Sequence, residues 1–354
     1  MKKFRRIGVL TSGGDAPGMN AAVRAVVRAA LANGVEVMGI YRGYSGLING
    51  EIKPLAIRDV SNIINKGGTV LYSDRCPEFK TEEGMKRALE NCEKFGIDGI
   101  VAIGGDGTFR GAISLTLNGV PCIGIPATID NDITSTDNTI GFDTAMNTVI
   151  ELVDKLRDTC ESHARCSVIE VMGRGAGDIA LTTAIASGAS GVVIPEIPFD
   201  EDDLLERMEK ARKLGKRNFL VLVSEGIGSE YGPAITEKIE KVTGIETRFA
   251  RLAHIVRGGS PTLRDRVMAS MMGTYAVEKL LAGESDIVIC EKVGKVEGID
   301  IKFALMLDRM YKGVLEEGDL DEFSEEDVKI MKYLAKKRRQ DLLELYEVSK
   351  KINL

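Results

Sequence analysis

The sequence is poor in the residues that build metal clusters and disulfide frameworks. It has six cysteines, none in a Cys-x-x-Cys spacing, and only two histidines among 354 residues. Neither a zinc site nor a disulfide framework is therefore indicated. Cys122 and Cys290 lie in apolar runs, where a free thiol packs as a small core side chain.

A long apolar segment is also missing. The N-terminus, Met-Lys-Lys-Phe-Arg-Arg, passes directly into a short apolar stretch, so we expect no signal peptide, no membrane span and a cytoplasmic location. The net charge of -6 predicts no general attraction to nucleic acids or anionic membranes. Any arginine cluster is then expected to bind a small anion locally.

Length and composition favour two globular domains. The 354 residues exceed one ordinary core, and 44% hydrophobic against 28% charged residues is typical of ordered proteins. Apolar runs of strand length alternate with helical patterns, which predicts an α/β fold. Strands are expected at 7–10, 35–41, 99–103, 120–125, 167–171, 191–194, 219–224 and 287–290, and helices at 19–31, 58–65, 81–95, 109–117, 144–159, 200–214, 262–281 and from 324 on.

The first expected strand ends in a glycine-rich loop, Thr11 to Gly18. Glycines between a strand and a helix let backbone N–H groups approach a phosphate, and the helix N-terminus adds a favourable dipole. A tight turn with Pro17 in the first helical turn explains the residues equally well. No Gly-Lys-Ser/Thr follows, so this is not the Walker pattern.

A second loop, Gly104-Gly-Asp-Gly-Thr108, follows the strand at 99–103. Two adjacent glycines admit a bulky anion, and Asp106 could hold Mg²⁺ between phosphates. A third loop, Thr128-Ile-Asp-Asn-Asp132, follows the strand at 120–125 and contains Asp130, the candidate general base. The aspartates of both loops could instead be helix caps, but three convergent strand ends favour a nucleotide or polyphosphate site.

Several later side chains could contact phosphate groups. Arg165 and Arg174 flank the strand at 167–171, and His254 stands between Arg248 and Arg257. Guanidinium groups bind phosphate through two hydrogen bonds, although a lone histidine is more often a packed or surface residue. The tail from 324 begins with a possible capping box and is expected to pack on the body or on a neighbouring subunit.

Five motifs in order resemble the bacterial 6-phosphofructokinases over residues 7 to about 305. They are Gly-Val-Leu-Thr-Ser-Gly-Gly-Asp-Ala-Pro-Gly-Met-Asn from Gly8, Gly-Gly-Asp-Gly at 104, Thr-Ile-Asp-Asn-Asp at 128, Met-Gly-Arg at 172 and Arg-Gly-Gly-Ser-Pro at 257. NAD kinases and diacylglycerol kinases share the Gly-Gly-Asp-Gly-Thr element, but they lack the third and fifth motifs.

The resemblance implies two doubly wound, Rossmann-like α/β domains with the active site in the cleft between them. Residues 1–140 with 257–305 would bind ATP and Mg²⁺, residues 141–256 would bind the sugar phosphate, and residues 306–354 would be a C-terminal helical extension. The implied reaction is ATP-dependent phosphorylation of fructose 6-phosphate at its 1-hydroxyl, a step of glycolysis. The implied assembly is a homotetramer whose subunits share active sites.

The resemblance also assigns the site residues. Catalytic roles fall to Asp130 as general base and to Thr128, Arg174 and Gly14. ATP would contact Gly14, Tyr44, Arg75, Cys76, Gly104, Gly105, Asp106, Gly107 and Thr108, with Mg²⁺ on Asp106. Fructose 6-phosphate would contact Thr128, Ile129, Asp130, Met172, Gly173, Arg174, Glu225, His254 and Arg257, with Arg165 and Arg248 from a neighbouring subunit.

Two positions bear on the phosphoryl donor. Pyrophosphate-using relatives typically carry Asp where Gly107 stands and Lys where Ala127 stands, so Gly107 favours ATP. Ala127 departs from the glycine usual in ATP-using members. Two alternatives to an ATP-dependent kinase stay open. They are a pyrophosphate-dependent phosphofructokinase and, less favoured, a non-catalytic sugar-phosphate-binding subunit.

An effector site for ADP or phosphoenolpyruvate is matched in part. The basic residues that match are Arg24, Arg28, Arg157 and Lys216. Ile57, Ser190 and Leu214 stand where well-known members have Arg, Glu and Lys, so weakened or altered effector control is expected.

Overall fold

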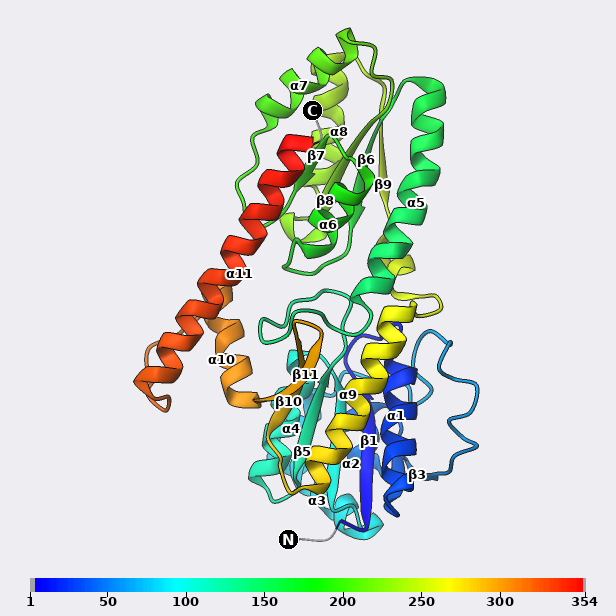
Figure 1. Ribbon diagram of the computed structural model, residues 1–354, viewed down its shortest axis with the longest axis vertical. Helices are drawn as coiled ribbons and strands as arrows, with labels where there is room; N and C mark the ends of the chain where they lie inside the picture. The colour runs from blue at the N-terminus through cyan, green and yellow to red at the C-terminus, as the bar shows by residue number, and fades with distance from the viewer. Residues whose placement is uncertain (1–3, 353–354) are drawn as a thin grey trace. The chain divides into compact units, whose positions relative to one another are not determined.

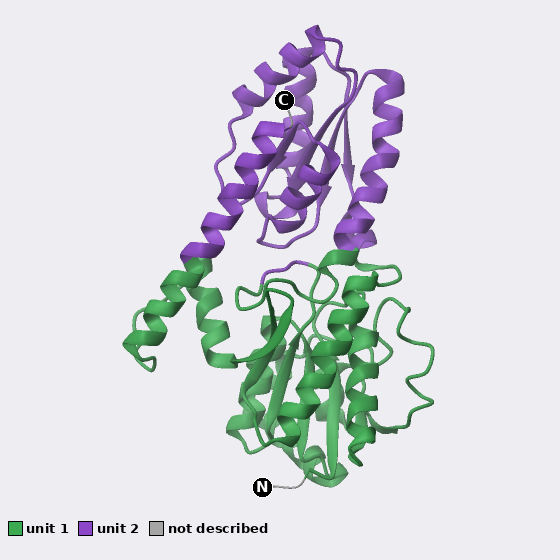
Figure 2. Cartoon of the chain, viewed as in Figure 1, with its two compact units in different colours: residues 1–129, 133–144, 257–335 green, residues 130–132, 145–256, 336–354 purple. Residues whose placement is uncertain are grey.

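The computed structural model describes residues 4–352 and divides them into two compact units (Figure 1, Figure 2). Unit 1 takes the residues up to Ile129, Ile133–Thr144 and Arg257–Ala335. Unit 2 takes Asp130–Asp132, Ala145–Val256 and the residues from Lys336 on. Within residues 4–352, no helix combines the length and hydropathy that a membrane crossing requires.

Unit 1 is built on a seven-stranded sheet with the strand order β11-β10-β5-β4-β1-β2-β3. The five inner strands run parallel, and β3 and β11 close the two edges in the antiparallel direction. The strands are β1 (Arg6–Ser12), β2 (Glu36–Ile40), β3 (Ile52–Leu55), β4 (Gly99–Gly104), β5 (Cys122–Pro126), β10 (Ile287–Lys292) and β11 (Lys295–Asp300). Chain crossovers on both sides of β1 make this a doubly wound sheet.

Helices cover both faces of the unit 1 sheet. They are α1 (Met19–Ala32), α2 (Gly43–Asn49), α3 (Glu82–Phe95), α4 (Asp106–Leu117), α9 (Leu263–Leu281) and α10 (Ile301–Lys312). On one face α1 and α9 pack side by side (Figure 1), and a Cβ on Gly273 would lie 2.7 Å from that of Ala25. On the other face α2, α3, α4 and α10 bury their apolar residues in one cluster with the strands.

Unit 2 contains a four-stranded parallel sheet with the order β7-β8-β6-β9. Its strands are β6 (Cys166–Val171), β7 (Gly191–Val193), β8 (Phe219–Ser224) and β9 (Thr247–Arg251). Its helices are α5 (Phe142–His163), α6 (Asp178–Ser187), α7 (Glu201–Lys213), α8 (Tyr231–Thr243) and the last part of α11 (Glu325–Ile352). Three short 3₁₀ segments are η1 (Pro77–Lys80), η2 (Glu225–Ile227) and η3 (Ala253–Arg257).

Side-chain caps fix the starts of the helices that the sequence predicts most clearly. Thr81, Asp200 and Thr262 accept hydrogen bonds from backbone N–H groups three residues later, and these bonds begin α3, α7 and α9. Ser324 and Asp327 form the expected capping box of α11, in which each side chain accepts a backbone N–H of the other.

A buried carboxylate of α9 holds the start of α5 within unit 1. Asp265 is 3% exposed and accepts hydrogen bonds from the backbone N–H groups of Gly141 and Thr144, each at 2.9 Å. Burial raises the pKa of Asp265, while these hydrogen bonds act in the opposite direction. The carboxylate satisfies helix N–H groups that have no partner inside their own helix.

The predicted helix over 58–65 is wrong, because this stretch forms successive turns. Asp59 accepts a hydrogen bond from the backbone N–H of Ala56 at 2.7 Å, and Asn62 has a φ of 59°. A left-handed residue at this place interrupts the helical hydrogen-bond ladder. The sequence pattern also did not indicate α2, β3, α6, α8, β9, α10 and β11.

After residue 305 the described chain contains the rest of α10, a stretch of turns and the helix α11. Contacts assign α10 and the first half of α11 to unit 1, and the residues from Lys336 on to unit 2. Met331 and Ala335 of α11 pack against Leu307 of α10. Farther along, Leu342 and Tyr346 are also buried. The functions assigned to the predicted domains stay predictions.

Candidate active site

Three strands of unit 1 end in register at one edge of the sheet. Ser12 of β1 pairs with Gly104 of β4, and Gly104 pairs with Pro126 of β5. The three loops therefore leave the sheet side by side, and the predicted convergence of these strand ends is confirmed. In open α/β sheets this carboxyl edge is where ligands bind.

The loops are tied together by short contacts that only glycine permits. A Cβ on Gly104 would lie 2.3 Å from the carbonyl oxygen of Ser12, and the Thr108 hydroxyl donates to that same carbonyl at 3.2 Å. The carbonyl of Gly104 in turn accepts the backbone N–H of Ala127 at 3.0 Å. Close backbone approach is a principal use of glycine, and here it links all three loops.

Tyr44 supports the second loop from within the core. Its hydroxyl donates to the carbonyl oxygen of Thr108 at 2.6 Å, and its ring stacks on Phe79 with the centroids 4.2 Å apart. It is 5% exposed, and burial raises its pKa well above the ordinary value. The structure thus shows a supporting position for Tyr44, while contact with ATP stays a prediction.

The second loop has room for a large anion. A Cβ placed on Gly105 or on Gly107 meets no heavy atom of the described residues within 4 Å. Asp106 is the first residue of α4, and its carboxylate pairs with Arg110 one turn later at 3.0 Å. Backbone N–H groups at a helix start favour negative charge, so the loop is suited to phosphate.

Asp106 is the carboxylate of this loop that could hold a metal ion. Among residues 4–352, no group of three or more His, Cys, Asp or Glu side chains is placed to bind one. Mg²⁺ commonly takes one or two protein carboxylates and completes its octahedron with phosphate oxygens and water. The residues present therefore fit a Mg²⁺ that arrives with a nucleotide.

An arginine lies against the first loop. A Cβ on Gly14 would lie 2.7 Å from Nη1 of Arg257, and this Nη1 donates to the carbonyl of Asp15 at 3.3 Å. The empty position at Gly14 thus makes space for the guanidinium group. The remaining residues predicted to bind ATP lie in the loop after β3, where Arg75 is exposed and Cys76 packs partly against the core.

The third loop runs from unit 1 into unit 2. Its first residues are firmly held in unit 1, because Thr128 accepts the hydroxyl of Thr139 through its carbonyl oxygen at 2.6 Å and Ile129 is fully buried. Ala127 is 1% exposed, so its methyl group packs inside the protein. Asp130, which belongs to unit 2, is 6% exposed.

Two residues of unit 2 adopt left-handed backbone conformations beside Asp130. Asn131 has a φ of 53° and Arg174 a φ of 56°, values that are uncommon outside glycine. Nη1 of Arg174 lies 3.5 Å from Oδ2 of Asp132, so the loops that contain these residues meet within unit 2. Strained backbone of this kind persists only where neighbouring groups hold it.

Glu225 holds the Arg174 loop through its backbone. Its Oε1 accepts hydrogen bonds from the N–H of Gly173 at 3.2 Å and of Arg174 at 2.8 Å. A Cβ on Gly173 would lie 2.5 Å from the carbonyl oxygen of Ala176, which shows how tight this turn is. Met172, at the start of the loop, is buried.

Arg165 and Arg248 lie together at the outer edge of the unit 2 sheet. Arg165 directly precedes β6 and Arg248 lies in the edge strand β9, and both form ion pairs with Glu246. The hydrogen bond from Arg165 is the main cause that lowers the pKa of Glu246. His254, in η3, is exposed.

The sequence did not indicate two side chains that contact predicted site residues or their immediate neighbours. Glu246 stands two residues before Arg248, a spacing that places both on one side of a strand and could have been noticed. Arg338 contacts Asn131 of the third loop from the C-terminal helix, and no local pattern indicates that contact.

The predicted effector residues fall in both units. Arg24 and Arg28 lie on α1 of unit 1. In unit 2, Arg157 donates to the carbonyl oxygen of Ser187, and Nζ of Lys216 lies 3.2 Å from the hydroxyl of Ser190. Burial lowers the pKa of Lys216, and the nearby positive charges of Arg157 and Arg207 lower it further.

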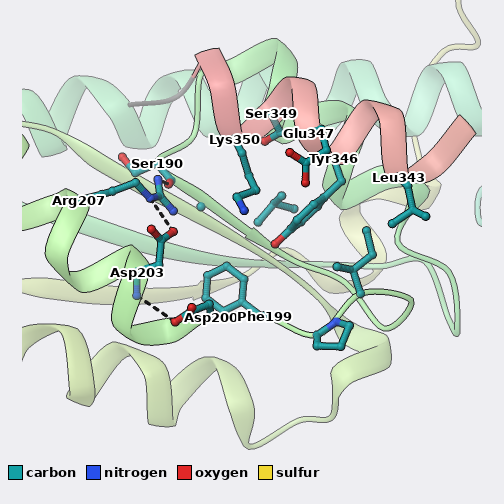
Figure 3. A pocket seen from close by; sticks show the side chains of 14 residues that line it. Ser190, Phe199, Asp200, Asp203, Arg207, Leu343, Tyr346, Glu347, Ser349 and Lys350 are labelled. Atoms are coloured by element: carbon teal, nitrogen blue, oxygen red, sulfur yellow. Dashed lines mark hydrogen bonds and ion pairs between the residues drawn. The ribbon is translucent and has the colours of Figure 1, made fainter. Parts of the chain in front are cut away.

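A pocket of about 200 Å³ lies beside Ser190 in unit 2 (Figure 3). Tyr346 and Lys350 of α11 form one side, and Asp200 and Arg207 lie across from them. Tyr346 is 9% exposed, and burial raises its pKa. The residues predicted to bind ATP or the sugar phosphate do not line this pocket.

The fold and the three strand-end loops define a doubly wound α/β protein whose glycine-rich sheet edge is suited to phosphate. The chain belongs to the Phosphofructokinase family, whose profile matches residues 6–280. This result confirms the family that the five sequence motifs predict.

Relatives of known name agree. The chain is 58% identical to the ATP-dependent 6-phosphofructokinase of Bacillus pumilus over 281 aligned residues. The alignment covers 79% of this chain and 88% of that protein. It is 53% identical to the ATP-dependent 6-phosphofructokinase of Clostridium botulinum over 308 aligned residues. This alignment covers 87% of this chain and 96% of that protein.

Solved structures show the same fold. Phosphofructokinase from Saccharomyces cerevisiae superposes with a TM-score of 0.85 at 30% identity, over 97% of this chain and 49% of that one, so this chain spans about half of the yeast chain. A pyrophosphate-dependent phosphofructokinase from Marinobacter aquaeolei gives 0.73 at 24% identity, over 84% of this chain and 83% of that one, and shows the fold alone.

Substitution of Glu225 separates a backbone role from a charge role. Glu225→Ala removes the acceptor for two backbone N–H groups, and we expect kcat/KM for fructose 6-phosphate to fall by about ten- to a hundred-fold. Glu225→Gln keeps a carbonyl acceptor, so its loss should stay within about three-fold. Steady-state kinetics of both variants give the answer. If Gln is as damaging as Ala, the negative charge is the essential property.

Proposed function

We propose that this protein transfers the γ-phosphoryl group of ATP to the 1-hydroxyl of fructose 6-phosphate, giving fructose 1,6-bisphosphate and ADP. The observation that carries the proposal is the in-register ending of β1, β4 and β5, which sets two glycine-rich loops beside the Thr128 loop. The names of its relatives support the choice of ATP and the sugar phosphate. The enzyme is then a phosphotransferase of glycolysis.

ATP binds along the first two loops of unit 1. The open space over Gly105 and Gly107 takes the phosphates, and backbone N–H groups at the start of α4 donate to them. Asp106 holds Mg²⁺, which when bound neutralises charge on the phosphate oxygens. Gly14, Arg75, Cys76 and Thr108 complete the nucleotide site.

Asp130 acts as the general base. Its carboxylate accepts the proton of the sugar 1-hydroxyl while that oxygen forms a bond to the γ-phosphorus, and the bond from phosphorus to the bridging oxygen of ADP breaks. Thr128 orients the transferring group through its hydroxyl. Arg75 and Arg174 stabilise the negative charge on the transferred group, where most catalysis of this reaction class arises.

The sugar phosphate binds to residues from several loops. Met172, Gly173 and Arg174 form one wall of its site. Glu225, His254 and Arg257 contribute further contacts. Arg165 and Arg248 contact the sugar phosphate bound to a neighbouring subunit. The exposed position of Arg248 in the edge strand β9, with the half-buried Arg165 beside it on Glu246, supports this role. The working form is then a homotetramer, in the cytoplasm.

Asp130→Ser tests the general base. Without a carboxylate to accept the proton, we expect kcat to fall by about 10² to 10⁴. KM for fructose 6-phosphate should change little, because the substrate keeps its phosphate contacts. Steady-state kinetics beside the exposed control Asp158→Ser provide the measurement. A kcat near that of the unmodified enzyme would remove Asp130 from the role of base.

Gly107→Asp tests donor selection. The position is open and lies at a helix start, where an acidic side chain is tolerated, so the melting temperature should stay unchanged. A carboxylate beside the ATP phosphates should lower kcat/KM for ATP by about a hundred-fold through repulsion. Gly107→Asn adds similar bulk without charge and should retain more activity. An equal loss in both variants would assign the effect to size.

Effector control by ADP or phosphoenolpyruvate is weak in this protein. The basic set Arg24, Arg28, Arg157 and Lys216 is present. However, Ile57 and Leu214 are 52% and 90% exposed and carry no charge, so the site has fewer cations to bind an anion. Rates at subsaturating fructose 6-phosphate should therefore respond little to ADP, both before and after Arg28→Ala. A strong, saturable activation that Arg28→Ala abolishes would contradict this.

A further inference from the structure

One side chain of the C-terminal helix contacts the loop that contains Asp130. Arg338 belongs to a run of four basic residues, 336–339, of which the other three are exposed. Its side chain is only 21% exposed. Its Nη2 lies 2.6 Å from Oδ1 of Asp178 and 3.2 Å from the carbonyl oxygen of Asn131. All three residues belong to unit 2.

Arg338 contacts the residue of the third loop that has a left-handed backbone. Asn131 separates Asp130 from Asp132 and has a φ of 53°. Its carbonyl oxygen accepts the hydrogen bond of a charged guanidinium, and its Nδ2 lies 3.4 Å from Oδ1 of Asp178. This carbonyl belongs to the peptide that joins Asn131 to Asp132, so the contact holds the loop backbone one residue after Asp130. A charge-assisted hydrogen bond is about twice as strong as a neutral one, which suits such a support.

The same guanidinium reaches the loop that contains Arg174. Asp178 begins α6, four residues after Arg174, and Arg174 lies 3.5 Å from Asp132. Arg338 is therefore bonded to the carboxylate that ends the Arg174 loop and to a carbonyl of the Asp130 loop. These are the two loops of unit 2 to which the proposed mechanism assigns the base and a phosphate-stabilising cation.

Arg338 also offsets partly buried negative charge. Asp178 and Glu196 are half-buried carboxyl groups whose pKa values desolvation raises, and in both cases the charge of Arg338 acts to lower them. Oε1 of Glu196 accepts the N–H of Gly177 at 2.9 Å, while Oε2 has no hydrogen-bond partner in the described part of the chain. Removal of one partner from a buried ion pair leaves an uncompensated charge, so neighbouring groups must rearrange.

We propose that Arg338 is a positioning residue for phosphoryl transfer. It holds the Asn131 carbonyl and, through Asp178, the Arg174 loop, so that Asp130 is oriented toward the reacting hydroxyl. The inference rests on the proposed role of Asp130 as the base. Misorientation of a base slows the chemical step and leaves ground-state binding largely intact, so the effect falls on kcat.

The test compares Arg338→Met with Lys337→Met, a neighbour on the same helix that is exposed. We expect Arg338→Met to lower kcat about ten-fold while KM for fructose 6-phosphate stays within about two-fold. Lys337→Met should behave like the unmodified enzyme. Titration calorimetry with fructose 6-phosphate counts the binding sites, so kcat is expressed per competent site. If Arg338 has a merely structural role, Arg338→Met should reduce the number of competent binding sites and leave kcat per competent site unchanged. That result would overturn the proposal.

Two further variants sharpen the result. Arg338→Lys keeps the charge but loses the fork that serves two acceptors, and we expect a loss of about three-fold. If Arg338→Met does not fold, the comparison of kcat between Arg338→Lys and Lys337→Met tests the proposal instead. Asp178→Asn should lower kcat, and the double variant Arg338→Met with Asp178→Asn should fall no further than Arg338→Met alone. A loss equal to the product of the two single losses would show independent roles and contradict the linkage.

Asp130→Ser, measured beside these variants, separates the two claims. A large loss in Asp130→Ser together with an unchanged kcat in Arg338→Met would overturn the positioning role and leave the base in place. Near-normal turnover in Asp130→Ser would overturn the base role and the positioning role that depends on it.

Discussion

The proposed chemistry of this protein depends on the register of β1, β4 and β5 in the unit 1 sheet. Ser12, Gly104 and Pro126 end three neighbouring parallel strands at one level, so the three loops that follow start side by side. The glycine at 104 is required because the carbonyl of Ser12 occupies the place of its missing side chain. A one-residue slip of β4 would exchange the faces of every side chain on it and move this glycine away from the contact.

Within each unit, polar side chains hold loops in conformations that the backbone alone would not favour. In unit 1 the hydroxyls of Thr108 and Tyr44 fix the start of α4, and Asp265 fixes the start of α5. In unit 2 the carboxylate of Glu225 holds the backbone beside Arg174. The hydrogen bonds of unit 1 are buried in a largely dry setting, where loss of one partner costs about 1–3 kcal/mol, whereas the bond to the Arg174 backbone is exposed. Stability and preorganisation are thus provided by the same bonds.

Sequence reasoning predicted most of the strands, the capping box at the start of α11 and the convergence of the glycine-rich strand ends, because these follow from local pattern and from the rules for parallel sheets. It failed over 58–65, where Asn62 adopts a left-handed backbone that no pattern of apolar residues reveals. It also missed the pairing of Arg338 with Asp178, 160 residues apart in the chain. A long-range ion pair leaves no periodic signal, and one half-buried arginine among four basic residues resembles its exposed neighbours.

The most direct measurement is formation of fructose 1,6-bisphosphate by the purified full-length chain with Mg²⁺ and fructose 6-phosphate, supplied in parallel with ATP or with pyrophosphate. The account predicts product with ATP and none above background with pyrophosphate. Product with pyrophosphate alone would contradict the donor assignment to Gly107. No product with either donor would contradict the enzymatic role and favour a sugar-phosphate-binding subunit.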